Sequence, residues 1–505
     1  MSAALSPAES RSHVVAALTA PELAAVVDLV LWVQDGAAMA ANHLGCVRLH
    51  PDGRHEVVAG VDPVPDTSPM AFLPYERELE APGPLVSTDN AYPYAAQRIL
   101  SLFADPDRSP DLAVVHTPRH HFPDEGGHAG EHGSLDVIQS RAPLVLSGPG
   151  VQRLGLVEDH ARLVDVGPTL AVLAGVPESD LVDAAGAPLD GRVLTAYLDD
   201  REPDPEPDRP RRVVGILWDG AHCGELLAMA QAGELPGVAR LVERGLALTG
   251  GAVAEFPSVT LTNHTSILTG VGPGRHGVLG NVFYDRSTGE QVVPNDAATW
   301  HRSAEWLRPS VRTVFEMVND HVAQADSPRT ASVDEAIDRG ADYGTMALLR
   351  QAGGFEAATT GLGDLLPDPA ASPFLARPEH LEDSYFHWGV QVDDLGLQQV
   401  LQLWEDPATA PTLTWWANVV TDAGHHGGGP RSEMARDSLR QSDARLVAFL
   451  DHLEGLGVLD EVTFLLTADH GFEAADPAVT GSWTPVLESL GVPYRDEGPG
   501  FVYLL

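Results

Sequence analysis

Lysine is absent from all 505 residues, so arginine is the only strongly basic side chain in the protein. Asp and Glu together number 72 against 31 basic residues, which gives a formal net charge of −41. A surface this acidic repels polynucleotide backbones and anionic membranes, so we expect neither as a partner. It also repels phosphate groups at long range. A site that handles phosphate would therefore need local positive charge, for which metal ions are the most direct source.

Cysteines and long apolar runs are also scarce. Cys46 and Cys223 cannot build a disulfide framework, and their separation is not that of a zinc ribbon. No apolar run approaches the roughly 20 residues that span a bilayer. The N-terminal segment has no basic region followed by an apolar core, so we expect no signal peptide. With 44% hydrophobic residues the composition is that of an ordinary globular protein, and we expect a cytoplasmic one.

Short β-rich runs alternate with longer amphipathic stretches along the chain. This alternation predicts an α/β fold with a largely parallel sheet. Residues 199–212 contain four prolines among alternating charges and are predicted to be a solvated linker. A second acidic, Pro-rich stretch, residues 61–84, is predicted to be a linker or a long loop.

Metal-competent side chains follow four of the apolar runs. Asp219 follows residues 213–218, Asp422 follows 415–421, and Asp469 and His470 follow 462–467. The fourth run, 112–115, precedes a loop that contains His116, His120, His121, His128 and His132. Ligands of open α/β sheets bind beyond the carboxyl ends of the strands, so these clusters predict one shared site. A single Asp at such a place is more often a helix N-cap, but three of them, two with histidine nearby, favour a metal site.

Residues 255–270 predict a turn at Pro257 and Ser258, followed by a helix from Thr260 that Gly270 ends. A hydroxyl in the first turn would lie among free backbone N–H groups at the positive end of the helix dipole. That position favours a phosphoryl group near Thr260. On local sequence alone, however, a capping role for Thr260 or Thr262 is the more common one.

Several motifs carry a resemblance to a known family. WDG at 218–220, FPSVTLTNHTSILTG at 256–270 and RHGVLGNVFYD at 275–285 resemble the alkaline phosphatase superfamily, in its type I phosphodiesterase and nucleotide pyrophosphatase branch. DAGHH at 422–426 with the following Gly429-Pro430, and ADHG at 468–471, are similar to that branch's metal-binding signatures. The matches follow the family's order across residues 213–505.

The resemblance implies a central, mostly parallel sheet with helices on both faces and a site with two divalent metal ions. Their carboxylate and imidazole ligands suit zinc. By this resemblance Asp219, Asp469, His470 and the Thr260 oxygen would hold one ion, Asp422 and His426 the other, and Asn281 would steady a phosphoryl oxygen. His425 stands where the family usually has glycine, so it remains an alternative to His426.

The order of the segments predicts a circular permutation. The family's remaining ligand is a histidine in a G-x-H-G segment near its C-terminus, yet no histidine follows His470. GEHGS at 130–134, and the segments 142–150 and 163–175 after it, resemble that part of the family. We therefore predict that residues 1–198 are the family's C-terminal portion, that 213–505 are its N-terminal portion, and that both form one catalytic domain. His132 is the predicted ligand, His128 is the alternative, and a separate N-terminal domain is the competing architecture.

The charge of the ligand set favours a diester substrate. Two Zn²⁺ ions bring four positive charges, which three aspartates and a Thr260 alkoxide neutralise. A neutral cluster discriminates less in favour of a phosphomonoester dianion, so a small monoanionic phosphodiester is the predicted substrate. Thr260 would attack phosphorus and form a phosphothreonine that water then hydrolyses. Residues 286–410 would shape the substrate pocket, with aromatic candidates at Trp300, Trp306, Phe315, Tyr385, Phe386 and Trp388, although core packing is the more common role of such residues.

Four alternatives remain at this stage. Residues 280–296 also resemble phosphonoacetate hydrolases, but those are expected to use lysines around the substrate carboxylate, and this chain has none. The others are a phosphomonoesterase, a metal-dependent transferase or isomerase of the same superfamily, and a non-catalytic binding module.

Overall fold

The computed structural model describes residues 7–80, 87–123, 126–199, 212–323, 327–354, 367–498 and 500–505. Most of the linker predicted at 199–212, and the end of the loop predicted at 61–84, lie outside these ranges. Within the described ranges, no helix combines the length and the apolar character that crossing a bilayer requires.

The main sheet is mixed but mostly parallel, as predicted. Its eight strands lie in the order β17 (Tyr343–Gly344), β16 (Thr330–Val333), β18 (Leu413–Asn418), β11 (Arg212–Trp218), β19 (Val462–Thr467), β8 (Leu144–Ser147), β12 (Gly245–Leu248) and β9 (Gly155–Val157). Only β8 runs antiparallel to its neighbours. The central strands β11, β18 and β19 are buried throughout, which explains why they are continuous apolar runs.

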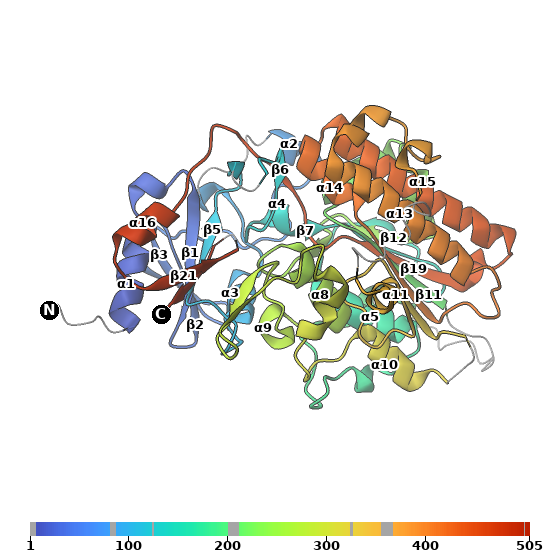
Figure 1. The fold of residues 1–505 in the computed structure, drawn as a ribbon, viewed down its shortest axis with the longest axis horizontal. Helices are drawn as coiled ribbons and strands as arrows, with labels where there is room; N and C mark the ends of the chain where they lie inside the picture. Colours follow the sequence, from blue (N-terminus) through green and yellow to red (C-terminus); the bar gives the residue numbers. More distant parts are fainter. Residues whose placement is uncertain are drawn as a thin grey trace.

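Helices cover both faces of this sheet (Figure 1), as expected. On one face α13 (Ser384–Leu403), α14 (Val420–Gly428) and α15 (Glu433–Gly455) pack against one another, and α15 also contacts α7 (Pro236–Glu243). On the other face lie α5 (Val166–Leu173), α8 (Thr260–Thr269) and α10 (Val314–His321), which also contact one another. Large side chains such as Trp218 and Trp416 fill the core between these layers.

A second sheet, which was not predicted from the sequence, lies beside the first and contains strands from the first and the last parts of the chain (Figure 1). Its seven strands are all antiparallel, in the order β21 (Tyr494–Glu497), β22 (Phe501–Leu504), β5 (Leu112–His116), β1 (Val27–Gln34), β2 (Ala37–Ala41), β3 (Gly45–Leu49) and β4 (His55–Gly60). Strand β5 therefore belongs to this second sheet and not to the main sheet, although the loop that follows it contains β6 (Gly130–Glu131), which pairs with β20 (Glu473–Ala474) beyond the end of β19.

Shorter elements connect these layers. Among the described residues, the other α-helices are α1 (Pro7–Leu18), α2 (Tyr75–Glu80), α3 (Ala95–Leu102), α4 (Val137–Ser140), α6 (Cys223–Gln231), α9 (Pro273–His276), α11 (Thr345–Ala352) and α16 (Thr484–Ser489). The remaining strands are β6 (Gly130–Glu131), β7 (Arg141–Ala142), β10 (Ala161–Arg162), β13 (Ala252–Val253), β14 (Phe283–Asp285), β15 (Glu290–Val292) and β20 (Glu473–Ala474). Two of these strands, β6 and β20, pair with each other although they lie far apart in the chain. Their pairing lies directly beside His132, which follows β6 in the sequence.

Candidate metal centre

Carboxylates and a histidine follow the carboxyl ends of three neighbouring strands in the main sheet. β11 runs directly into Asp219, β19 leads to Asp469 and His470, and β18 is followed by α14, whose first turn contains Asp422. Because β18, β11 and β19 are parallel neighbours, their carboxyl ends lie side by side. All four side chains are buried, with Asp469 and His470 fully inaccessible to solvent.

Asp219, Asp469 and His470 form one compact ligand group. Their candidate ligand atoms lie within 4.8 Å of one another. The Nε2 atom of His470 is 3.2 Å from Asp469 Oδ2 and 3.6 Å from Asp219 Oδ1. None of these three atoms has a hydrogen-bond partner, although all are buried.

A second group contains His132, Asp422 and His426, again with ligand atoms within 4.8 Å of one another. His426 Nε2 lies 3.6 Å from Asp422 Oδ2, and Asp422 Oδ1 is buried without a partner. The ring of His132 stacks on that of His470, with 3.6 Å between centroids and 10° between planes. This stacking places the second group directly against the first.

The imidazoles of both groups are oriented alike, and in the first group Nδ1 of His470 lies 3.1 Å from the Gly471 carbonyl oxygen. Nδ1 of His132 lies 2.9 Å from the Ser258 carbonyl oxygen, and Nδ1 of His426 lies 3.0 Å from that of Gly130. Donation from Nδ1 to a carbonyl fixes the tautomer that leaves Nε2 as the free, metal-binding nitrogen. Burial lowers the pKa of His470 to about 3 and holds those of His132 and His426 well below their usual value, so all three are neutral, as metal ligands must be.

The pKa values of the ligand carboxylates are shifted in the opposite direction. Burial and the neighbouring Asp469 raise the pKa of Asp219 to about 7, and burial and Asp219 raise that of Asp422 well above its usual value. These buried acids lie beside the three neutral imidazoles of the two groups. Together with the unpartnered oxygen and nitrogen atoms, this arrangement fits two divalent metal ions and the nitrogen-and-oxygen ligation that zinc accepts.

Thr260 begins α8 beside the first group. The preceding residue, Val259, occupies the N-cap position, and no side chain caps this helix end. Thr260 is therefore not a cap, and its side chain lines a cavity together with Asp219. Asn281 accepts a hydrogen bond at its Oδ1 from the Leu261 N–H, at 3.2 Å, which directs its amide N–H groups away from the helix.

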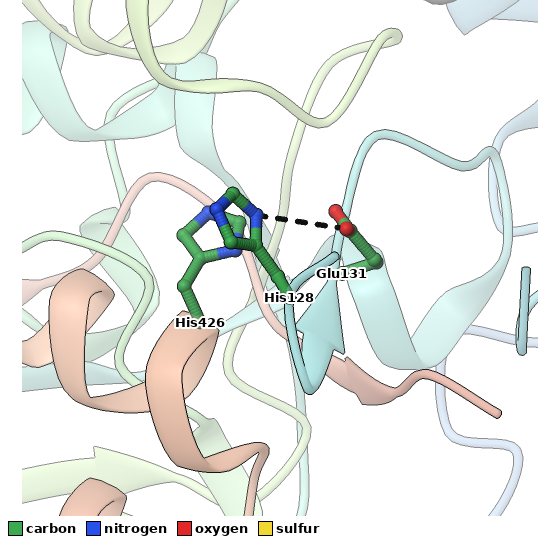
Figure 2. Close-up of side chains that lie close together, drawn as sticks. All are labelled: His128, Glu131 and His426. Carbon is green, nitrogen blue, oxygen red and sulfur yellow. Dashed lines mark ion pairs between the residues drawn. The ribbon is translucent and has the colours of Figure 1, made fainter. Parts of the chain in front are cut away.

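His425 and His128 occupy different surroundings from His426 and His132. The ring of His425 stacks on Phe472, and its Nδ1 lies 2.6 Å from the Thr421 carbonyl oxygen. His128 lies over His426, and its Nδ1 is 3.6 Å from Glu131 Oε1 (Figure 2). His128, Glu131 and His426 also meet the spacing of a metal site, but Asp422 and His132 compete for the same His426. In the loop before them, His120 packs against Phe122 and Trp483 instead.

Two further residues contact the ligand carboxylates, and the sequence analysis missed both roles. His264, one helical turn after Thr260, lies with its Nε2 3.7 Å from oxygens of both Asp219 and Asp469. Its Nδ1 is 2.9 Å from Glu335 Oε2, which also accepts a hydrogen bond from Trp415. The polar His264 on a helix that is buried throughout was a usable signal.

The second is Tyr385 at the start of α13, whose hydroxyl donates to Asp422 Oδ2 at 2.7 Å. From the sequence, Tyr385 was predicted only as an aromatic candidate for the substrate pocket. No local pattern links it to Asp422, because the contact forms across α13 and α14.

The cavity beside Thr260 has a volume of about 370 Å³. Of the six aromatic candidates, Trp300, Tyr385 and Trp388 line it. Phe315 and Phe386 are fully buried in the core instead, and Trp306 packs against the core. Core packing was the more common role expected of these six aromatic residues, and three of them have it.

The family model described as type I phosphodiesterase / nucleotide pyrophosphatase matches residues 213–490, more than half of the chain. An uncharacterised pyrophosphatase/phosphodiesterase of Schizosaccharomyces pombe is 35% identical over 115 residues, or 21% of this chain and 23% of that protein. The alkaline phosphatase PafA of Elizabethkingia meningoseptica is 34% identical over 84 residues, or 17% of this chain and 15% of that protein. The chain thus matches less than a quarter of the length of these two relatives.

Similar solved structures include a phosphonoacetate hydrolase of Sinorhizobium meliloti in complex with phosphonoformate, with 24% identity and a TM-score of 0.32. The murine ectonucleotide pyrophosphatase/phosphodiesterase 5 shows 13% identity and a TM-score of 0.37. Each alignment covers 52% of this chain and 57% of the other.

Proposed function

Since the chain belongs to the type I phosphodiesterase / nucleotide pyrophosphatase family, we propose that it hydrolyses small phosphodiesters with Thr260 as nucleophile. One observation carries this proposal. The Thr260 side chain starts α8 uncapped, in a cavity that it shares with Asp219, beside buried ligand atoms that lack partners. A threonine with a purely structural role would need neither the cavity nor the unpartnered ligand atoms beside it.

Asp219, Asp469 and His470 would hold one zinc ion next to Thr260, and His132, Asp422 and His426 would hold a second. When bound, the ions supply Lewis acidity and positive charge, which lower the pKa of a nearby hydroxyl and offset negative charge on a phosphoryl group. The unpartnered oxygens of Asp219, Asp422 and Asp469 support this assignment, because each has lone pairs that no protein donor uses.

The chain's own residues would carry out the substitution in two steps. The Thr260 hydroxyl gives its proton to solvent and its Oγ1 forms a bond to phosphorus while the bond from phosphorus to one ester oxygen breaks; that alkoxide takes a proton from solvent and leaves as an alcohol. Water then cleaves the bond between phosphorus and Thr260 Oγ1, which restores the Thr260 hydroxyl and releases the phosphomonoester of the second alcohol. The amide N–H groups of Asn281 are free to donate to a non-bridging oxygen, because its Oδ1 is held by the backbone.

The surroundings of the cavity favour a diester over phosphonoacetate. A phosphonoacetate-type substrate carries a carboxylate that needs a cationic partner. The described residues that line the cavity include no arginine, and the chain has no lysine. A neutral or cationic ester group needs no cationic partner in the cavity.

The proposal includes the permuted order of the chain. His132 and β8 come from residues 1–198, whereas the other five ligands and the neighbours of β8 come from residues 213–505. Helix α1 near the N-terminus contacts α16 and β22 near the C-terminus. In the unpermuted order these segments would be consecutive, so their proximity supports the inference.

The test is hydrolysis of bis(p-nitrophenyl) phosphate by zinc-loaded protein, compared with p-nitrophenyl phosphate and phosphonoacetate. Thr260→Ala should lower turnover by several orders of magnitude, and acid-quenched wild-type protein should carry the p-nitrophenyl phosphoryl group on Thr260. The matched control is Thr262→Val on the same helix. Thr262 Oγ1 is buried without a partner, so an isosteric methyl should be tolerated. Near-wild-type turnover by Thr260→Ala would refute the mechanism.

A further inference from the structure

A histidine and a carboxylate that belong to neither assigned ligand set lie close to His426. His128 and Glu131 come from the loop and the short strand that precede His132, and His128 Nδ1 is 3.6 Å from Glu131 Oε1 (Figure 2). The side chain of His128 is 38% exposed, whereas that of His426, whose ring centroid is 4.3 Å away, is 11% exposed. His128 is therefore the more accessible of the two rings to an ion in solution.

The distance between His128 and Glu131 suits two ligands of one metal ion. Ligand atoms about 2.1 Å from a tetrahedral zinc ion are roughly 3.4 Å apart. A direct hydrogen bond between nitrogen and oxygen is shorter, at about 2.7–3.2 Å. His426 and Asp422 show the same 3.6 Å between Nε2 and Oδ2. His128 and Glu131 thus have the spacing of a metal-binding pair rather than that of a hydrogen bond.

His426 completes a group of three ligands with this pair. The candidate ligand atoms of His128, Glu131 and His426 lie within 4.8 Å of one another, as do those of His132, Asp422 and His426. We call the first set the outer group and the second set the inner group. The two groups share His426, and each consists of two imidazoles and one carboxylate.

The backbone holds the outer group against the end of α14. The Ala129 N–H donates to the His426 carbonyl at 2.8 Å, and His426 Nδ1 lies 3.0 Å from the Gly130 carbonyl oxygen. Gly130 allows this approach, because a Cβ atom there would lie 2.5 Å from the His425 carbonyl oxygen. Glu131 in turn is fixed by the pairing of β6 with β20. The outer group is therefore set beside the inner one by main-chain contacts.

A similar pair elsewhere in the chain lacks a third ligand. His55 Nδ1 is also 3.6 Å from Asp62 Oδ2, and the His55 side chain is 33% exposed. Among the described residues, none completes a metal-binding group with these two. The third ligand, rather than the pair itself, distinguishes the outer group, and His55 provides a matched control.

We propose that the outer group is a third zinc-binding position, through which the second zinc ion reaches and leaves the inner group. The inference rests on the zinc centre of the proposed function and concerns how that centre is filled. A backbone carbonyl occupies Nδ1 of His426, so only Nε2 is free and His426 binds one ion at a time. The ion moves inward by keeping His426 while His132 and Asp422 replace His128 and Glu131.

The inner group should bind zinc more tightly, because its ligands are better oriented. The Tyr385 hydroxyl donates to Asp422, and His132 Nδ1 lies 2.9 Å from a backbone carbonyl oxygen. Partners of this kind are typically worth about 10- to 100-fold in metal affinity. Among the described residues, Glu131 is the only ion-pair partner of His128. An ion at the outer group is therefore expected to move to the inner one.

Zinc competition against a chromophoric chelator tests the outer group where the inner one is broken. His132→Ala should retain a second, much weaker zinc constant. Adding His128→Ala or Glu131→Gln to this variant should weaken that constant a further tenfold or more, whereas adding His55→Ala should leave it unchanged. Absence of a second constant in His132→Ala, or a constant that either outer substitution leaves unchanged, would overturn the outer group.

Exchange of isotopically labelled zinc tests the route in the zinc-loaded protein. The path by which an ion enters is also the path by which it leaves, so loss of the outer group should slow both directions equally. By mass spectrometry, His128→Ala should exchange one of its two zinc ions several-fold more slowly than the wild type, while both equilibrium constants stay unchanged. His55→Ala should exchange at the wild-type rate. Unchanged exchange in His128→Ala would overturn the entry role.

These measurements use zinc alone, which separates this inference from the proposed function. If bis(p-nitrophenyl) phosphate is hydrolysed but zinc exchange is unchanged in His128→Ala, the phosphodiesterase function stands and the entry role is wrong. If His128→Ala slows exchange but no diester is hydrolysed by the wild type, the entry role stands and the proposed reaction is wrong.

Discussion

Replacing Tyr385 by phenylalanine should weaken one metal position and leave the other unchanged. The Tyr385 hydroxyl donates to Asp422 Oδ2 at 2.7 Å, while the unpartnered Asp422 Oδ1 remains for a metal ion. A hydrogen bond to a charged group contributes about 1.5–3 kcal/mol, which corresponds to roughly 10- to 150-fold in an equilibrium constant. Loss of a partner that orients a metal ligand typically costs about 10- to 100-fold in metal affinity, which agrees with this range.

The assay is zinc competition against a chromophoric chelator, which should resolve two binding constants in the wild type. Tyr385→Phe should lower the weaker or the stronger constant, but only one of them, by about 10- to 100-fold. Tyr343→Phe is the control, because the Tyr343 hydroxyl donates to Gln399 rather than to a ligand carboxylate. Unchanged zinc constants in Tyr385→Phe would refute the positioning role of this hydroxyl.

Four further predictions concern the metal centre, the chain order and the stability. His132→Ala should remove most zinc affinity at one position, whereas His120→Ala, which alters a ring packed on Phe122 and Trp483, should retain both zinc ions by metal analysis. Chelation of zinc should abolish turnover and lower the melting temperature, because three buried carboxylates lose their counter-ions, and added zinc should restore both; unchanged activity after verified zinc removal would contradict this. A fragment of residues 213–505 should be insoluble or inactive without residues 1–198, since it lacks β8 and His132, and full activity of the fragment would refute the permuted arrangement. Burial raises the pKa of Asp28 from 3.8 to about 7, so the folded state holds more protons than the unfolded state between these values and the free energy of unfolding falls by roughly 4 kcal/mol as pH rises through this range; Asp28→Asn should flatten that slope in denaturant titrations at pH 5 and pH 8.

The second sheet shows how a local signal was overlooked. Strands β1 and β2 are joined by Asp35 and Gly36, both with positive φ, as a two-residue hairpin turn requires. Asp-Gly between β-forming runs predicts such a hairpin from sequence alone. The next strands were harder to predict, because β4 is exposed along its whole length and has no alternating pattern of apolar residues.

The parallel part of the main sheet was predictable for a physical reason. Strands covered on both faces must be apolar throughout, so β11, β18 and β19 stand out as continuous runs in the sequence. Strand β8 has the same apolar character but runs antiparallel between β19 and β12, and strand direction leaves no trace in composition.

By itself the sequence determined which side chains stand at the ends of these strands, because Asp219, Asp469 and His470 follow their strands directly along the chain. It also determined that Thr260 begins a helix, since local hydrogen bonding and the terminal Gly270 define that element. Only the tertiary structure decided which histidine of the N-terminal loop stacks on His470, and that Tyr385 and His264 contact ligand carboxylates. Those contacts join residues far apart in the chain, and such pairs meet only through the packing of whole helices and sheets.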